Sequence, residues 1–291
     1  MSSLTVAAPA KLNLWLKVLG RRDDGYHCLD SLVAFLDVRD TVHLMPADDL
    51  GLTLSGPMAP ALVATAAGTN LSLQAARALQ HATGITAGVH IHLEKHIPVA
   101  AGLGGGSADA AATLVGLCCL WRLSLTPPEL AAIALTLGAD VPACVIGRPV
   151  RVGGIGADVT PVENLPSMWI VLVNPRQDVA TKAVFAAHAL APNRPREVYA
   201  APGSLIELTA QCRRLGNDLT AAAVAVAPAI GQVLTLLAHD RTALASAMSG
   251  SGATCFALYD SAAAAAAAAS AISQAQPGWW VMVARPHTTG A

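Results

Sequence analysis

The sequence predicts an α+β fold, because strand-like and helix-like segments are mixed along the chain. Three observations support this: alternating apolar residues over 10–18, a long apolar run over 110–121, and glycine-rich loops near residues 104 and 251. The 291 residues suffice for one large domain or two moderate ones. We place a boundary near residue 150, giving domains 1–150 and 151–291, since residues 148–156 are rich in glycine and poor in helix signals.

Composition excludes several classes of protein. The formal net charge is -1 and no polybasic stretch occurs, so we expect no nucleic-acid or membrane-surface partner. The alanine tract Ala262–Ala269 is too short to span a bilayer, and the N-terminus lacks the pattern of an export signal. The six cysteines form no C-x-x-C pair and mostly lie in apolar runs, which favours buried thiols in a reducing compartment. We therefore expect a cytoplasmic protein.

The first half of domain 1–150 begins with two extended segments. Residues 10–18 alternate so that Leu residues share one face, while Lys11 and Asn13 point together from the other. The turn Gly20–Gly25 follows, and residues 31–45 are expected to pair with the first strand.

Helix signals dominate the rest of that domain. Asn70 is placed to cap a helical pattern that continues to about residue 80. Thr126-Pro-Pro-Glu129 is a capping box that opens a helix ending near Gly138. Asp140 follows at once and, by its own chemistry, is placed to cap a further helix.

The second domain is predicted to mix both element types. Its expected elements are strands at 168–173, 255–259 and 279–283, and helices at 181–190, 204–214, from 217 onward, 230–237 and from 262. The proline-rich stretch 191–202 is interpreted as a loop.

A glycine loop at residues 96–109 lies between a predicted strand at 89–94 and the helix from Ala110. Its glycines let the backbone approach a ligand closely and adopt positive φ, and the N–H groups of the following helix suit an anion. Ser107 is placed to cap that helix or to bind a phosphate with its hydroxyl. The spacing fits neither the Walker nor the dinucleotide fingerprint. The residues alone leave two interpretations open, a phosphate loop and a flexible strand-to-helix connection.

Five separated segments carry more information together than singly. They are Ala8–Leu14 (APAKLNL), Gly20–His27 (GRRDDGYH), Pro98–Ala110 (PVAAGLGGGSADA), Leu137–Pro142 (LGADVP) and Ser249–Ala253 (SGSGA). As a set that spans about residues 7–259, they resemble the GHMP kinase superfamily. Ala108 departs from the pattern, because a second Ser or Thr is frequent there in the family, and Cys144 stands where a large apolar residue is common.

The resemblance implies a fold and an activity. The fold would be two α+β domains with the active site in the cleft between them. The activity would be ATP-dependent phosphorylation of the 2-hydroxyl of 4-diphosphocytidyl-2-C-methyl-D-erythritol, a step of non-mevalonate isoprenoid precursor synthesis. The cofactors would be ATP and the Mg²⁺ that accompanies it. The partner would be this small molecule alone, with the enzyme a monomer or homodimer.

The resemblance also assigns roles to matching residues. Lys11 and Asp140 match the catalytic pair. Asn13, Tyr26, His27 and Phe185 match residues that hold the cytidyl part of the substrate. The implied ATP-binding residues are Asn70, Pro98, Val99, Ala100, Ala101, Gly102, Leu103, Gly104, Gly105, Gly106, Ser107 and Ala108. No residue is assigned as a metal ligand.

Other interpretations remain open at this point. Taken alone, Asp140 is an N-cap and Lys11 a solvated strand residue. His90 and His92 share a strand face, which fits a polar sheet surface better than a metal site. A GHMP kinase for mevalonate, homoserine or a sugar is one alternative function, and a catalytically silent binding protein is another. A Rossmann dehydrogenase is set aside because Ser107 breaks the fingerprint.

Overall fold

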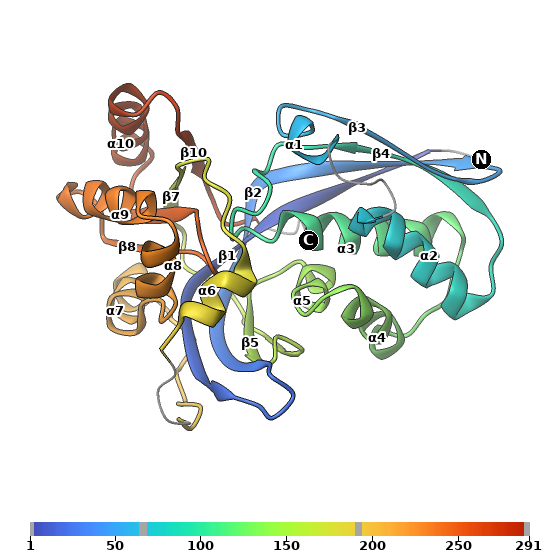
Figure 1. The fold of residues 1–291 in the computed structure, drawn as a ribbon, viewed down its shortest axis with the longest axis horizontal. Helices are drawn as coiled ribbons and strands as arrows, with labels where there is room; N and C mark the ends of the chain where they lie inside the picture. Colours follow the sequence, from blue (N-terminus) through green and yellow to red (C-terminus); the bar gives the residue numbers. More distant parts are fainter. Residues whose placement is uncertain (1–2, 64–68, 190–193, 288–291) are drawn as a thin grey trace. The chain divides into compact units, whose positions relative to one another are not determined.

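The computed structural model describes residues 3–63, 69–189 and 194–287 (Figure 1). Two compact units make up the chain. The first comprises Met1–Lys11, Val38–Val99 and Gly104–Gly147, and the second comprises Leu12–Asp37, Ala100–Leu103 and Arg148–Ala291. The two long strands β1 (Leu4–Arg21) and β2 (His27–Ala47) therefore contribute residues to both units. The division into domains 1–150 and 151–291 stays a prediction about the family's domains.

The first unit places helices against a sheet. Strand β4 (Gly88–Glu94) pairs antiparallel with residues 41–47 of β2 and parallel with β3 (Leu50–Ser55). The helices of this unit are α1 (Pro60–Val63), α2 (Leu71–Thr83), α3 (Gly105–Leu120), α4 (Pro127–Leu137) and α5 (Val141–Ile146). Helix α3 lies directly on the sheet, because a Cβ at Gly116 would be 2.8 Å from Val6 Cγ2.

The second unit contains an antiparallel sheet in the order β10-β7-β9-β8. Its strands are β7 (Trp169–Asn174), β8 (Ala245–Met248), β9 (Cys255–Tyr259) and β10 (Trp280–Ala284). Strand β5 (Val150–Gly154) pairs instead with Leu29–Val33 of β2, and β6 (Asp158–Pro161) pairs with β5.

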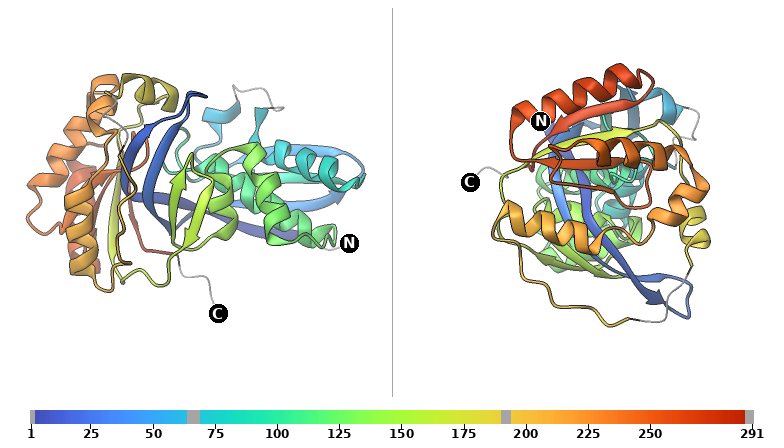
Figure 2. Two further views of the ribbon diagram at one scale, coloured as in Figure 1. Left: turned by 90° about the horizontal axis from the view of Figure 1, so that it is seen from below. Right: turned by 90° about the vertical axis from the view of Figure 1, so that its left-hand side faces the viewer.

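Helices pack on this second sheet (Figure 2). Those that contact its strands are α7 (Leu205–Leu215), α9 (Ala229–His239) and α10 (Ala262–Ala275), while α6 (Thr181–Ala187) packs on α8 (Thr220–Val226), which packs on α9. Buried Leu237 of α9 and Ile272 of α10 share one apolar core with Val171 and Val173 of β7. Burial of such side chains is the main stabilising contribution to this unit.

The α+β prediction is confirmed, and most element positions agree within a few residues. Asn70 caps α2 by accepting a hydrogen bond from Ser72 N–H at 2.9 Å. The capping box at Thr126–Glu129 is present. Residues 194–202 contain no helix or strand, and residues 191–193 of the predicted loop, with residue 190 of the predicted helix, lie outside the described residues.

Two expectations were wrong. Helix α3 begins at Gly105 rather than near Ala110, with Gly104 at the N-cap, so Ser107 lies in the first turn and does not cap. Half of the cysteines are buried rather than most of them, because Cys119 is exposed and two others are half-buried. Among the described residues no helix is long and apolar enough to cross a membrane.

Candidate active site

Lys11 and Asp140 form an ion pair in the first unit. Lys11 Nζ lies 3.1 Å from Asp140 Oδ2, and the side chains are 8% and 46% exposed. Lys11 comes from β1, whose central residues are buried on both faces, so it is not the solvated strand residue that its type suggests. Asp140 precedes α5 at the N-cap position, yet its side chain makes no capping hydrogen bond. Its carboxylate is directed to Lys11 instead, and the capping interpretation of its side chain is wrong.

Gly104 brings the start of α3 against Lys11. Its φ is +63°, and a Cβ at this position would lie 2.5 Å from Lys11 Cγ, so only glycine satisfies both backbone and neighbour. No side chain caps the N-terminus of α3 from this position. The unpaired N–H groups of a helix and its dipole favour an anion at such an end. A lysine, a half-exposed carboxylate and a helix N-terminus whose charge distribution suits an anion therefore lie together.

Residues Ala100–Leu103, the middle of the predicted phosphate loop, belong to the second unit. There they pack on the glycine-rich segment Ser249–Ala253. A Cβ at Gly102, whose φ is +74°, would collide with the Ser249 carbonyl oxygen and lie 2.7 Å from Gly252 O. Thr254 N–H donates to Ala101 O at 3.1 Å. Two glycine-rich segments thus contact each other backbone to backbone, which requires the absence of side chains.

Asn13 is held by Ser31 and Ser249, and the sequence linked neither serine to it. Asn13 Nδ2 donates to Ser31 Oγ at 2.7 Å, and that hydroxyl donates to Trp15 O at 2.6 Å. Asn13 N–H donates to Ser249 Oγ at 3.1 Å, and Ser249 Oγ donates to Gly102 O at 2.9 Å. Ser249 stood within a recognised segment, whereas Ser31 is an isolated serine in an apolar run and gave no signal.

His27 and Phe185 contact each other in the second unit. Their ring centroids are 4.8 Å apart with the planes inclined by 31°. Phe185 comes from α6, whose first residue Thr181 hydrogen-bonds through its hydroxyl to Ser251 Oγ at 2.9 Å. Burial, with the positive charges of Arg21 and His188, lowers the pKa of His27 below its usual 6.5. The neutral ring with one donor and one acceptor therefore prevails at pH 7.

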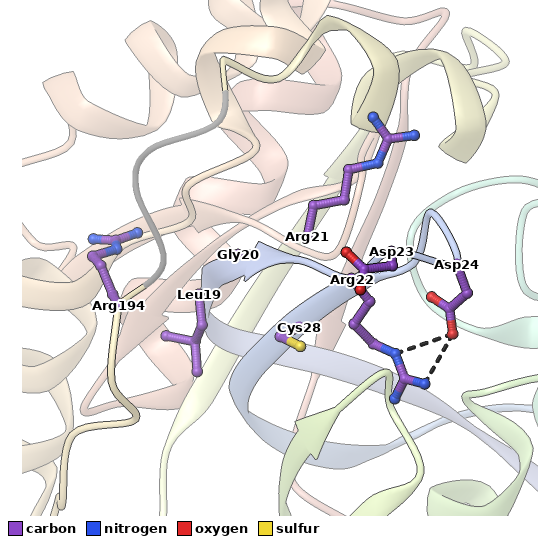
Figure 3. Close-up of a pocket in the computed structure, with 8 residues that line it drawn as sticks. All are labelled: Leu19, Gly20, Arg21, Arg22, Asp23, Asp24, Cys28 and Arg194. Atoms are coloured by element: carbon purple, nitrogen blue, oxygen red, sulfur yellow. Dashed lines mark hydrogen bonds and ion pairs between the residues drawn. The ribbon is translucent and has the colours of Figure 1, made fainter.

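Tyr26 directly precedes His27 in the chain and is exposed. It is 59% exposed, and its N–H donates to Asp24 Oδ1 at 3.2 Å. The neighbouring hairpin, with Cys28 and Arg194, lines a pocket of about 620 Å³ (Figure 3). Figure 3 shows the guanidinium of Arg22 turned toward Asp24, whose carboxylate lies 2.9 Å from it.

Asn70 caps α2, in addition to the ATP-binding role that the family resemblance implies. Its Oδ1 accepts the capping hydrogen bond of α2. The next residue, Leu71, reaches the phosphate loop, because a Cβ at Gly106 would lie 3.4 Å from Leu71 Cδ1. Asn70 is thus close in the chain to a residue that touches the loop.

His90 and His92 lie on a polar face of the first sheet. Both accept or donate hydrogen bonds at 3.0 Å with Thr53, and His92 also with Ser55. In the part of the chain that the structure describes, no group of three or more His, Cys, Asp or Glu residues is placed to hold a metal ion.

Comparison with known proteins identifies the family. A model of the GHMP kinases N terminal domain matches residues 70–148, and a model of the GHMP kinases C terminal domain matches residues 200–278. The chain is 45% identical over 285 residues to a protein of Paramagnetospirillum magneticum, covering 98% of this chain and 99% of that one. The chain belongs to the GHMP kinase family.

Two of the proteins most similar to this chain share one name. The P. magneticum relative is named 4-diphosphocytidyl-2-C-methyl-D-erythritol kinase, as is a Cereibacter sphaeroides protein that is 49% identical and covers 96% of this chain and 97% of its own length. Among GHMP kinases of known structure, the crystal structure of 4-(cytidine 5'-diphospho)-2C-methyl-D-erythritol kinase matches with a TM-score of 0.78 at 33% identity. It covers 98% of this chain and 100% of that one.

Proposed function

We propose that this GHMP kinase transfers the γ-phosphoryl group of ATP to the 2-hydroxyl of 4-diphosphocytidyl-2-C-methyl-D-erythritol. The observation that carries the proposal is the Lys11–Asp140 pair at 3.1 Å beside the N-terminus of α3. Near-full-length identity of 45% and 49% to relatives that bear this substrate's name supports the choice of substrate.

The chemistry assigned to the pair follows from the demands of phosphoryl transfer. Such a reaction needs positioning and charge stabilisation more than covalent participation. In the proposal Asp140 accepts the proton of the attacking hydroxyl, and its 46% exposure leaves the carboxylate accessible to a substrate. Lys11 holds the carboxylate of Asp140 in place through their ion pair and stabilises charge on the transferring group.

The nucleotide is assigned to the phosphate loop. Backbone N–H groups of Gly104 to Ser107, at the start of the 16-residue helix α3, would hold the α- and β-phosphates of ATP. The remaining loop residues from Pro98 and the neighbouring Asn70 complete the proposed ATP site. Mg²⁺ would accompany the nucleotide and would supply neutralisation of the phosphate charge.

The cytidyl group is assigned to the second unit. Phe185 and Tyr26 offer aromatic faces to a pyrimidine, and neutral His27 offers a donor and an acceptor to its edge. Asn13, whose amide nitrogen donates to Ser31 Oγ, completes the proposed cytidyl site. The proposal also treats the enzyme as a cytoplasmic monomer or homodimer without nucleic-acid or membrane partners, consistent with its net charge of -1.

The test is ADP production by the purified protein with three acceptors. We expect turnover with 4-diphosphocytidyl-2-C-methyl-D-erythritol, none with mevalonate or homoserine, and loss of turnover in Asp140→Ala. Phosphorylation of mevalonate or homoserine instead would keep the fold and overturn the substrate. ATP binding without turnover on any of the three would favour a catalytically silent binding protein.

A further inference from the structure

Three charged side chains form a buried cluster at the base of the phosphate loop. Lys95 Nζ donates to Asp40 Oδ2 and, at 2.6 Å, to Asp109 Oδ2. The three residues are between 0% and 3% exposed, and all belong to the first unit. Charged residues are rarely buried to this degree unless they are paired. The chemistry of phosphoryl transfer assigned above does not use them.

Each member of the cluster fixes a different part of the chain. Asp40 Oδ1 accepts hydrogen bonds from His96 N–H and, at 2.9 Å, from Ile97 N–H, the two residues directly before the phosphate loop Pro98–Ala108. Asp109 lies in the second turn of α3, just after the loop. Lys95 joins the two carboxylates, so the cluster ties the residues before the loop to the helix that follows it.

The backbone of Lys95 is itself fixed. Lys95 N–H donates to Ser55 O at 2.8 Å, and its carbonyl accepts from Met58 N–H at 3.1 Å. Gly105, the first residue of α3, packs on the cluster, because a Cβ there would be 3.2 Å from Ile97 Cγ2 and 3.5 Å from Lys95 Nζ. The separation of Ile97 and Gly105, between which the loop runs, is therefore set by this cluster.

We propose that Lys95, together with Asp40 and Asp109, is a positioning group that holds the two ends of the phosphate loop at the separation needed to bind a nucleotide. The inference rests on the proposed ATP site. It predicts that breaking the link weakens nucleotide binding while the fold and the acceptor-substrate site persist. Misplacement of binding groups by about 1 Å has large effects on such sites.

Asp109 is the best residue for the test. Burial, with the charge of Asp40, raises the pKa of Asp109 to about 7 against the lowering effect of Lys95, and Asp109 Oδ1 has no hydrogen-bond partner among the described residues. Removing Asp109 leaves Lys95 paired with Asp40, so no uncompensated buried charge remains. Asp109→Ala breaks the link, whereas Asp109→Asn keeps an oxygen that accepts from Lys95.

Thr113→Val is a matched control on the same helix. Thr113 is fully buried one turn further along α3, and its hydroxyl donates to Asp109 O at 2.8 Å. The substitution removes a buried hydrogen bond without touching the cluster's side chains. It therefore reports what loss of stability alone does to nucleotide binding.

The readouts are the Kd of ADP by titration calorimetry, the KM of the acceptor substrate, and Tm. We expect Asp109→Ala to raise the Kd of ADP about tenfold or more with the acceptor KM little changed, and Asp109→Asn and Thr113→Val to bind ADP like the wild type. An unchanged Kd in Asp109→Ala, or an equal rise in Thr113→Val, would overturn the proposal. Wild-type protein that binds ADP but does not turn over the acceptor would overturn only the proposed substrate, whereas failure to bind ADP would overturn both.

A measurement on the wild type decides the case if Asp109→Ala does not fold. The N–H groups of His96 and Ile97 are bound by Asp40, so their hydrogen exchange should be slow in the nucleotide-free protein and little changed by ADP. Exchange as fast as in exposed loops, slowed only when ADP binds, would show that the nucleotide rather than the cluster orders the loop.

Discussion

Gly104→Ala gives the sharpest test of the active-site geometry. The new Cβ would lie 2.5 Å from Lys11 Cγ, whereas carbon atoms in ordinary contact are about 3.5–4.0 Å apart. Lys11 must therefore shift by roughly 1 Å, which breaks its 3.1 Å contact with Asp140. A misplacement of about 1 Å lowers catalytic rates about 100-fold. That change corresponds to about 2.7 kcal/mol in the activation free energy. The φ of +63° adds a loss of roughly 1–2 kcal/mol in the free energy of unfolding.

Gly84→Ala separates the two effects. Gly84 ends α2 with a φ of +75°, and no atom lies within 4 Å of where its Cβ would be. It therefore carries the backbone strain without the collision. Steady-state ADP release gives kcat for both variants, and urea unfolding gives both stabilities. We expect similar losses of stability but a loss of kcat only in Gly104→Ala. Wild-type kcat in Gly104→Ala, or an equal loss in Gly84→Ala, would refute the reasoning.

Three further predictions concern single side chains. Asp140→Asn keeps the shape but not the proton acceptor, so kcat should fall about 10²–10⁴-fold with Tm nearly unchanged, measured by ADP release and calorimetry. The pKa of His27 is lowered in the folded protein, so on acidification the unfolded chain takes up the proton first. The free energy of unfolding should therefore fall only as the pH drops below about 6.5. The KM of the cytidyl substrate should likewise stay flat from pH 8 to 6.5, and a rise within that range would contradict a neutral His27. Asn70→Ala should lower the unfolding free energy by about 1 kcal/mol in urea titrations while Asn70→Asp does not, because aspartate retains the cap.

Local structure could be predicted from the sequence where a residue type has one strong structural preference. Asn70 and the Thr126–Glu129 box were predicted as caps and act as caps, because capping depends on two or three neighbouring residues. The predicted start of α3 lay too late in the chain because Gly104, Gly105 and Gly106 have poor helix propensity. Tertiary contacts of the loop on one side and of Lys11 on the other override that propensity.

The candidate site was predictable only in part, for a related reason. Lys11 and Asp140 are 129 positions apart in sequence, and only the family resemblance joined them before the structure placed them at 3.1 Å. Neither serine that holds Asn13 could be linked to it from the sequence, because a buried hydroxyl has no periodic or compositional signature. Lys95 was passed over for the same reason, since its burial depends on carboxylates 55 residues before it and 14 after it.

The interleaving of the two compact units has a consequence for synthesis of the chain. Residues 12–37 leave the ribosome early but belong with a unit that is completed only by residues after 148. Within that unit Leu29–Val33 must wait for β5, and Leu16 must wait for the bridge to Asn217. At the usual 5–20 residues per second, Leu29–Val33 lack β5 for roughly 6–25 seconds and Leu16 lacks Asn217 for roughly 10–40 seconds. A nascent-chain series that releases translation at successive lengths should therefore show residues 12–37 accessible to protease until nearly the whole protein has been made.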